Sequence, residues 1–189
     1  MEWIVPVILV VAIVVIAAGL YLLLARKALV HLNGRVDEEW ENLCDQFSRR
    51  LELLPHLVEL VKKYAPHEES VYISVMQARE QTAGAQTPLP AARTECSMQQ
   101  AVRSLFEVAE AYPKLQASTK FLQLQSELRD MQDRVQAARR GYNVRVREFN
   151  SRLEAFPNTL FLRSLHYHRR DYFELDGTVL TADAPRVQF

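Results

Sequence analysis

Hydrophobic and polar positions follow two different patterns along this chain. Residues Trp3 to Leu24 carry no formal charge, and fifteen of these twenty-two residues are Ile, Leu or Val. A helix of that length rises about 33 Å, enough to cross a hydrocarbon core of about 30 Å. The segment therefore predicts one transmembrane helix. The anchor and its flanks are marked by Trp3, Tyr21, Arg26 and Lys27.

A cleaved signal peptide is the main alternative reading of this segment. A signal peptide needs a basic start, a shorter apolar stretch and a small-residue cleavage site, whereas Met1 and Glu2 supply no basic residue and bulky apolar residues follow Ala17–Gly19. We therefore expect the segment to stay attached. Basic residues gather on the cytoplasmic side of a span. Because they follow this span and none precedes it, we expect the rest of the chain to face the cytoplasm.

Beyond the anchor, apolar residues recur every three or four positions, which is the period of one helix face. The pattern predicts an interrupted helix over 36–64 with Pro55 as the kink, a connecting loop over 83–92, and three further helices. Trp40, Phe47 and Leu54 form an inward stripe that should pack against the last of these helices, at Leu128, Val135, Tyr142 and Phe149. The three further helices are expected over 67–82, over 97–111, and from 118 or 119 to 155.

The last thirty residues change character. Short apolar and aromatic clusters within 160–173 predict a short helix, and the stretch 175–189 reads as an extended tail. No segment has a convincing strand period. The expected fold is all-α, with a transmembrane anchor over 1–25 and a cytoplasmic domain over 26–189. That domain is predicted to be an up-and-down four-helix bundle with a short C-terminal helix and an extended tail.

The charge balance argues against a nucleic-acid partner. The chain has 23 Lys plus Arg and 23 Asp plus Glu, so it lacks the net positive charge that nucleic-acid binding favours. We interpret basic pairs such as Arg49–Arg50 as solvated helix faces or ion-pair partners. In a reducing cytoplasm Cys44 and Cys96 should be thiols, with Cys44 a small core residue, whereas a bridge between them stays open if the domain lies outside.

Several separated sequence blocks resemble the LemA family, in the order in which that family has them. Together they cover nearly the whole of the chain after the anchor. The blocks are RRLELLPHLVELVKKYAPHE at 49–68, VAEAYPKLQASTKFLQLQSEL at 108–128, ARRGYNVRVREFN at 138–150, FPNTL at 156–160, DYFELD at 171–176 and PRVQF at 185–189.

The resemblance implies a membrane-anchored cytoplasmic four-helix bundle of mostly bacterial origin, with no cofactor and no established catalytic activity. The chain departs from the family at His56, where Asn is common, and at Gly141, where a larger residue is common. The residues taken as family-motif positions are Pro55, His56, Glu110, Tyr112, Pro113, Tyr142, Asn143, Phe156 and Pro157.

Candidate chemistry is sparse. His67-Glu68-Glu69 lacks the second histidine of a zinc-protease motif. His166 and His168 with Asp171 nearby could serve a metal site, but surface and packing roles are commoner for such residues. His56 beside Pro55 should chiefly satisfy a backbone carbonyl that the kink frees. The sequence therefore predicts no catalytic, cofactor-binding or metal-binding residue.

Two classes of function follow. The leading hypothesis is a non-enzymatic scaffold or interaction module at the inner membrane, whose partners are the lipid bilayer and an unidentified membrane or cytoplasmic protein. One version of it is an accessory or regulatory subunit of a membrane protease or transporter. The alternative is a metal-binding or hydrolytic enzyme that uses residues such as His56 and Glu59. No nucleic acid and no small-molecule substrate is expected.

Overall fold

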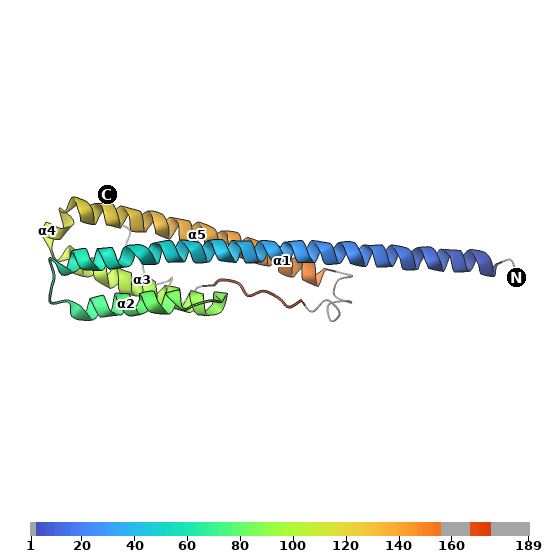
Figure 1. Cartoon of the computed structure of the whole chain (residues 1–189), viewed down its shortest axis with the longest axis horizontal. Helices are drawn as coiled ribbons and strands as arrows, with labels where there is room; N and C mark the ends of the chain where they lie inside the picture. Colours follow the sequence, from blue (N-terminus) through green and yellow to red (C-terminus); the bar gives the residue numbers. More distant parts are fainter. Residues whose placement is uncertain (1–2, 156–166, 175–189) are drawn as a thin grey trace. The chain divides into compact units, whose positions relative to one another are not determined.

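The computed structural model describes residues 3–155 and 167–174, and all regular secondary structure in those ranges is helical (Figure 1). This confirms the all-α prediction for the described part of the chain. The helices are α1 (Ile4–Lys62), α2 (Glu69–Ala83), α3 (Pro88–Glu110), α4 (Pro113–Gln116) and α5 (Thr119–Glu154).

The anchor and the first amphipathic segment form a single helix. α1 continues for 59 residues from Ile4 to Lys62, because the connecting stretch 25–35 has no proline and only one glycine, Gly34. Open space surrounds the position that a side chain at Gly34 would take. Pro55 lies inside the helix, so the predicted interruption does not end it.

The predicted loop over 83–92 is too long, and the helix predicted from residue 97 is correspondingly too short. α3 begins at Pro88, and Ala91 and Ala92 are already buried. Proline suits the first turn of a helix, because the backbone N–H groups there have no partner within the helix. Pro88 and Pro90 therefore start the helix here, and the connection between α2 and α3 shortens to residues 84–87.

Tyr112 and Pro113 end α3 as predicted, but a further turn of helix follows them. α4 begins at Pro113 and buries Leu115 completely. α5 then begins at Thr119 and ends at Glu154, within one residue of the prediction.

The short helix predicted within 160–173 is wrong where the structure describes it. Residues 167–174 adopt no helical structure, because side chains of other elements bind their backbone groups. Residues 160–166 and the predicted tail 175–189 lie outside the described residues.

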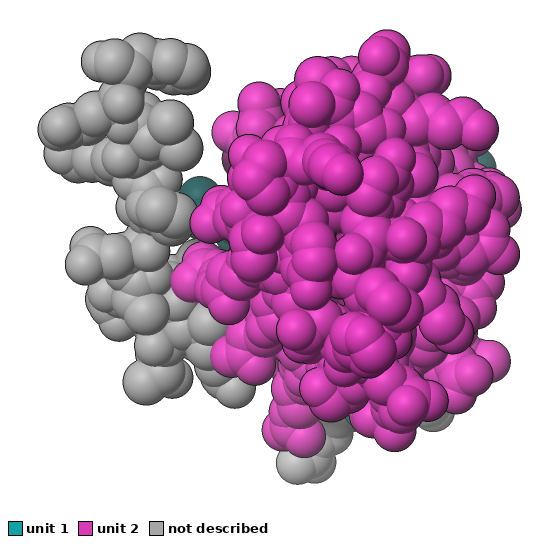
Figure 2. All heavy atoms as spheres, turned by 90° about the vertical axis from the view of Figure 1, so that its left-hand side faces the viewer, with its two compact units in different colours: residues 1–38, 144–170 teal, residues 39–143, 171–189 magenta. Residues whose placement is uncertain are grey.

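The chain divides into two compact units, coloured separately in Figure 2. Unit 1 comprises residues 1–38 and 144–170, and unit 2 comprises residues 39–143 and 171–189. In unit 1 the buried apolar residues are Leu29, Val36, Val146, Phe149 and Leu153.

The main apolar core lies in unit 2, where α2 packs against α3. Every helix contributes buried side chains to this core, and along the longer helices these residues recur every three or four positions. Its buried members are Leu51, Leu54, Leu57, Val58, Val61, Ala65, Tyr72, Val75, Ala78, Met98, Ala101, Leu105, Ala109, Leu115, Phe121 and Leu128.

The predicted inward stripe is confirmed at three positions within unit 2. Trp40 contacts Tyr142 with 5.5 Å between ring centroids, and Leu54 shares the core cluster with Leu128. Phe47 is buried as well, but its ring lies 5.8 Å from that of Phe173, a residue that the prediction did not include.

Candidate functional site

In unit 2, side chains of α5 hold the backbone of the non-helical segment 171–174. Asn143 donates from Nδ2 to the carbonyl of Phe173 at 3.0 Å and accepts at Oδ1 from the N–H of the same residue at 2.9 Å. The hydroxyl of Tyr142 donates to the carbonyl of Asp171 at 2.8 Å. Two neighbouring residues of α5 thus satisfy three backbone groups.

The ring of Phe173 is the apolar part of this attachment. It is 1% exposed and packs on Phe47, whose ring also lies 5.4 Å from the guanidinium carbon of Arg50. Burying an aromatic ring of this kind stabilises a fold by roughly 1.5 to 3 kcal/mol. The segment is therefore fixed by a buried ring as well as by hydrogen bonds.

Unit 1 contains the same amide arrangement. Asn150 donates from Nδ2 to the carbonyl of Arg170 at 3.0 Å and accepts from the N–H of Arg170 at 2.9 Å. The side chain of Arg170 donates from Nε to Asn33 Oδ1 at 3.1 Å and forms an ion pair with Asp37. Residues near both ends of the described chain therefore meet at Arg170.

The chemistry of asparagine explains both arrangements, which we call the Asn143 clamp (on Phe173) and the Asn150 clamp (on Arg170). Its side-chain amide offers one acceptor and two donors, which match the N–H and C=O that a residue of an extended chain presents on one side. Asn143 and Asn150 are seven residues apart, so they share one face of α5 with a rise of about 10.5 Å between them. Arg170 and Phe173 are three residues apart, which is about 10 Å in an extended chain.

Sequence reasoning singled out two of these five residues. Tyr142 and Asn143 stood among the family-motif positions but without a role, and Asn150, Arg170 and Phe173 were missed. One signal was available: asparagine is a poor helix former, and two asparagines spaced by seven in a long helix indicate a side-chain task.

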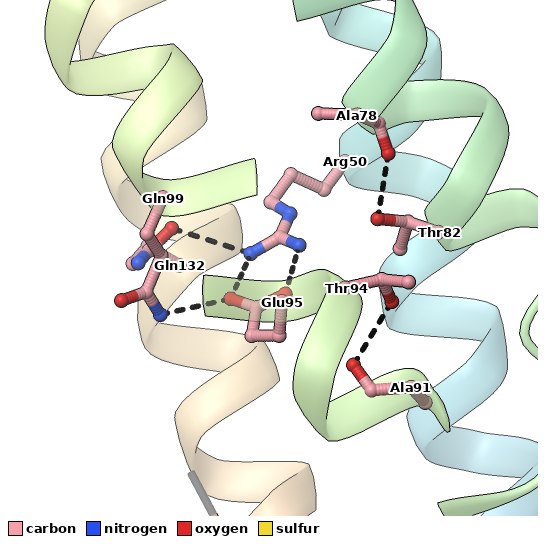
Figure 3. Close-up of polar contacts among 8 residues, drawn as sticks. All are labelled: Arg50, Ala78, Thr82, Ala91, Thr94, Glu95, Gln99 and Gln132. Atoms are coloured by element: carbon pink, nitrogen blue, oxygen red, sulfur yellow. Dashed lines mark hydrogen bonds and ion pairs between the residues drawn. The ribbon is translucent and has the colours of Figure 1, made fainter. Parts of the chain in front are cut away.

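A buried ion pair lies deeper in unit 2 (Figure 3). Arg50 donates from Nη1 to Glu95 Oε1 at 2.8 Å, and its Nη2 pairs with the other carboxylate oxygen. The side chains are 2% and 3% exposed. Gln99 donates to Glu95 at 2.9 Å and Gln132 accepts from Arg50 at 3.5 Å. Helices α1, α3 and α5 are thereby joined by one polar network.

The interpretation of Arg49 and Arg50 as ion-pair partners is correct, but the two residues differ in burial. Arg49 pairs with Asp45 at 3.0 Å on the exposed side of α1. Arg50 points inward, and its Nε has no hydrogen-bond partner within the described part of the chain. Removing either member of the inner pair would leave a buried charge without its counterion, which is costly.

The two residues of the enzyme alternative do share a surface feature. His56 and Glu59 are both exposed, and they line an open groove of about 320 Å³ together with Lys63, Lys120 and Glu127. Among the described residues, no group of three His, Cys, Asp or Glu side chains is placed to hold a metal ion. The groove is thus polar and open to solvent.

The other predicted positions have structural places. Pro55 is half-buried in α1, Glu110 is exposed at the end of α3, and Tyr112 and Pro113 begin the turn of α4. His168 is exposed. Phe156, Pro157 and His166 lie outside the described residues. The anchor residues Trp3, Tyr21, Arg26 and Lys27 are all exposed.

Gly141, one of the departures from the family pattern, faces an acidic side chain in unit 2. A Cβ at this position would lie 3.2 Å from Oε2 of Glu39. That is the mobile end of a side chain, so a larger residue fits only if Glu39 moves. The glycine thus leaves room for a carboxylate beside α5.

Two groups have shifted acidities. Burial, with a smaller contribution from the Glu68 carboxylate, raises the pKa of Tyr72, whose hydroxyl donates to the carbonyl of Ala65. Burial and the nearby Glu41 raise the pKa of the Cys44 thiol. Cys44, which was predicted to be a small core residue, is only half-buried, and Cys96 is half-buried as well. A raised thiol pKa lowers the thiolate fraction and argues against a nucleophilic role for Cys44.

Comparison with protein-family models gives a match over most of the chain. The model of the LemA family matches residues 39–189. These residues include all of unit 2, with the Asn143 clamp and the Arg50–Glu95 pair, and the Asn150 clamp of unit 1. A search of the curated proteins finds no match to this chain.

Proposed function

Because this chain belongs to the LemA family, we propose that it is a single-pass membrane protein whose helical domain serves as a non-enzymatic interaction module. The domain is an up-and-down four-helix bundle at the cytoplasmic face of a bacterial inner membrane. Its partners are the lipid bilayer and a membrane or cytoplasmic protein. It uses no cofactor and no small-molecule substrate.

The observation that carries the membrane anchor is the exposed apolar surface at the start of α1. Among the described residues, α1 is the one helix long and apolar enough to cross a membrane. Contiguous apolar exposure on this scale is rare on soluble proteins, and a bilayer would cover it. The exposed apolar side chains are Leu9, Ile13, Val15, Ile16, Leu20, Leu23 and Leu24.

The orientation rests on the charges beside the span. Arg26, Lys27 and Arg35 follow it closely, and no Lys or Arg precedes it. Basic residues near the end of a span favour the cytoplasmic side. We therefore place the N-terminus outside and the C-terminal domain inside.

The role as an interaction module draws on what the polar residues at family positions do. Tyr142 and Asn143 bind the chain's own backbone, which gives these family positions a structural role. The core of unit 2 is apolar except for the Arg50–Glu95 network. Such an interior supports rigidity, and function then lies on the helix surfaces.

An extraction experiment tests the anchor. The full chain should stay in the membrane pellet after alkaline carbonate and after high salt, because apolar burial and not surface charge holds it there. A variant without residues 1–25 should appear in the supernatant. Release of the full chain by carbonate would refute the proposed anchor.

Cross-linking in native membranes tests the interaction role and distinguishes its versions. Recovery of a membrane protease or transporter subunit would assign the accessory role. The enzyme alternative predicts instead that His56→Ala and Glu59→Ala each reproduce the phenotype of cells that lack the protein, although the variant protein stays folded and in the membrane.

A further inference from the structure

A line of three hollows runs along one face of unit 2, between α1 and α5. The first is the groove at His56 described above. The second, of about 360 Å³, is lined by Arg49, Leu53, Glu127, Asp130, Met131 and Arg134. The third, of about 400 Å³, is lined by Glu39, Asn42, Gln46, Arg134, Ala137 and Ala138. Neighbouring hollows share Glu127 and Arg134, so we treat them as one seam.

Most residues of the seam form two rows that repeat with the period of a coiled coil, and Glu59, Gln123, Asp130 and Ala137 lie beside these rows. On α1 the residues of the row alternate in steps of three and four, and on α5 a matching row does the same. A repeat of 3.5 residues is the pattern with which helices pack along a common line. The row on α1 is 39, 42, 46, 49, 53, 56, 60 and 63, and the row on α5 is 120, 124, 127, 131, 134 and 138.

The first two hollows contain four large apolar side chains that are only partly covered. Leu53, Leu60, Leu124 and Met131 are half-buried, although each sits at a seam position of the repeat. A further helical layer over the seam would remove this surface from water. Heptad positions of this kind form the core of a coiled coil when a partner covers them.

Opposite charges line the two walls of each hollow, together with Lys63 of α1 and Glu127 of α5 in the first and Glu127 and Arg134 of α5 in the second. In the first hollow Glu59 of α1 lies with Lys120 of α5. In the second, Arg49 of α1 lies with Asp130 of α5. In the third, Glu39 of α1 lies with Arg134 of α5. In these three pairs the α1 members are negative, positive and negative along the seam, and the α5 members are positive, negative and positive.

We propose that the seam binds the same seam of a second copy of this chain. A two-fold axis along the helices sets α1 of one copy against α5 of the other at the same level. Glu59, Asp130 and Glu39 then face Lys120, Arg49 and Arg134 of the partner, and these three pairs are complementary across the axis, as a two-fold interface requires. This axis also keeps both N-termini on one side, and this part of the inference alone rests on the proposed anchor.

The size of the seam suits a dimer. Residues 39–63 of α1 rise about 36 Å, and two adjacent helices are about 20 Å wide. The face is therefore about 700 Å² per copy, close to the roughly 800 Å² per partner of standard stable interfaces. A partner with a single docking helix would cover only part of this width.

Charge reversal tests the proposal in the full chain, purified in detergent, with native mass spectrometry and sedimentation as the measurements. We expect a dimer for the unchanged chain. Arg49→Glu should weaken it at least tenfold, as should Asp130→Arg, and the double variant should return to within about threefold of the unchanged chain. Arg103→Glu on the exposed face of α3 is the matched control and should leave the dimer intact.

A mixed cross-link gives an independent measurement if a charge variant unfolds. Both native cysteines are replaced by serine, and copies with Leu53→Cys are mixed with copies carrying Met131→Cys. A short thiol cross-linker should join unlike copies. A chain that stays monomeric overturns the proposal, as does a dimer that ignores both reversals or yields no mixed product. Carbonate extraction tests the anchor separately, because its outcome does not depend on whether the chain forms a dimer.

Discussion

Asn143 satisfies the N–H and the C=O of one residue, Phe173, with a single side-chain amide. No other residue type of its size can do this, because aspartate lacks a donor and leucine of similar volume lacks both groups. Asn143 therefore binds the backbone of residue 173, and these hydrogen bonds do not depend on its side chain. The specificity for phenylalanine there must come from the buried ring position beside Phe47.

Replacing Asn143 by alanine should therefore destabilise the fold by about 2 kcal/mol, because a donor and an acceptor of Phe173 lose their partners. Thermal unfolding of the full chain in detergent, followed by circular dichroism, measures the change. Gln116→Ala is the control, since Gln116 is exposed, lies outside the seam and donates a hydrogen bond to the carbonyl of Glu110 at 3.3 Å. Equal effects at the two positions would contradict the role assigned to the clamp.

The Arg50–Glu95 pair permits a sharper test at the same scale. Glu95→Ala alone should cost about 3 to 5 kcal/mol, since it leaves the Arg50 guanidinium buried without a counterion. Arg50→Met combined with Glu95→Leu should cost far less than the sum of the single changes. Denaturant unfolding of the four chains in a double-mutant cycle gives the coupling. Additive effects would mean that the pair is not a unit.

The sequence could predict little of this residue-scale detail. The partners in the two clamps are 30 and 20 residues apart, and those in the buried ion pair are 45 apart. A single sequence does not state which distant residues meet. Arg49 and Arg50 have the same surroundings in the sequence, and only their angular positions on α1 turn Arg49 toward solvent and Arg50 toward the core.

At the scale of elements, hydrophobic periodicity predicts the helices well and their starts less well. α5 is long, regular and free of proline, so its limits follow from the pattern. α3 was mislocated because Pro88 and Pro90 were taken as loop residues, although proline is compatible with a first turn. The segment 167–174 was misassigned because aromatic clustering has no period that separates a short helix from a bound strand-like stretch.

The inward stripe on α1 can be tested by one substitution on the buried face of the helix and one on its exposed face. Phe47→Ala should lower the stability by about 3 to 5 kcal/mol, because it removes a buried ring that supports Phe173. Glu59→Ala, on the side exposed in a single copy, should change the stability of the monomer by no more than about 0.5 kcal/mol. The melting temperatures of the two full-length variants provide the comparison. A severe effect at Glu59 instead would point to a polar site in the groove.

At the scale of the whole molecule, a neutral total conceals an uneven distribution of charge. Unit 1 has nine Lys plus Arg and five Asp plus Glu, whereas unit 2 has fourteen and eighteen. The unit that contains the apolar segment is thus the basic one. An excess of basic residues beside a span is what the cytoplasmic side of a membrane protein favours.

Protease protection checks this orientation. Protease added to spheroplasts should leave the domain intact, because the proposed orientation places it inside the sealed membrane, and detergent should make the domain accessible. A periplasmic marker protein, digested in the same sample, controls for protease activity. Digestion of the domain in sealed spheroplasts would reverse the orientation and reopen a bridge between Cys44 and Cys96.

The contacts of Arg170 have a consequence for how the chain is made. Arg170 binds Asn33 and Asp37, which precede it by 137 and 133 residues. During synthesis α1 leaves the ribosome long before residue 170 is added, and closing so long a loop is a late step. A chain that ends before residue 170 keeps the hydrogen bond between Asn33 and Asp37 but lacks the contacts from Arg170 to both residues. The Arg170 contacts can therefore form only when synthesis of the chain is nearly complete.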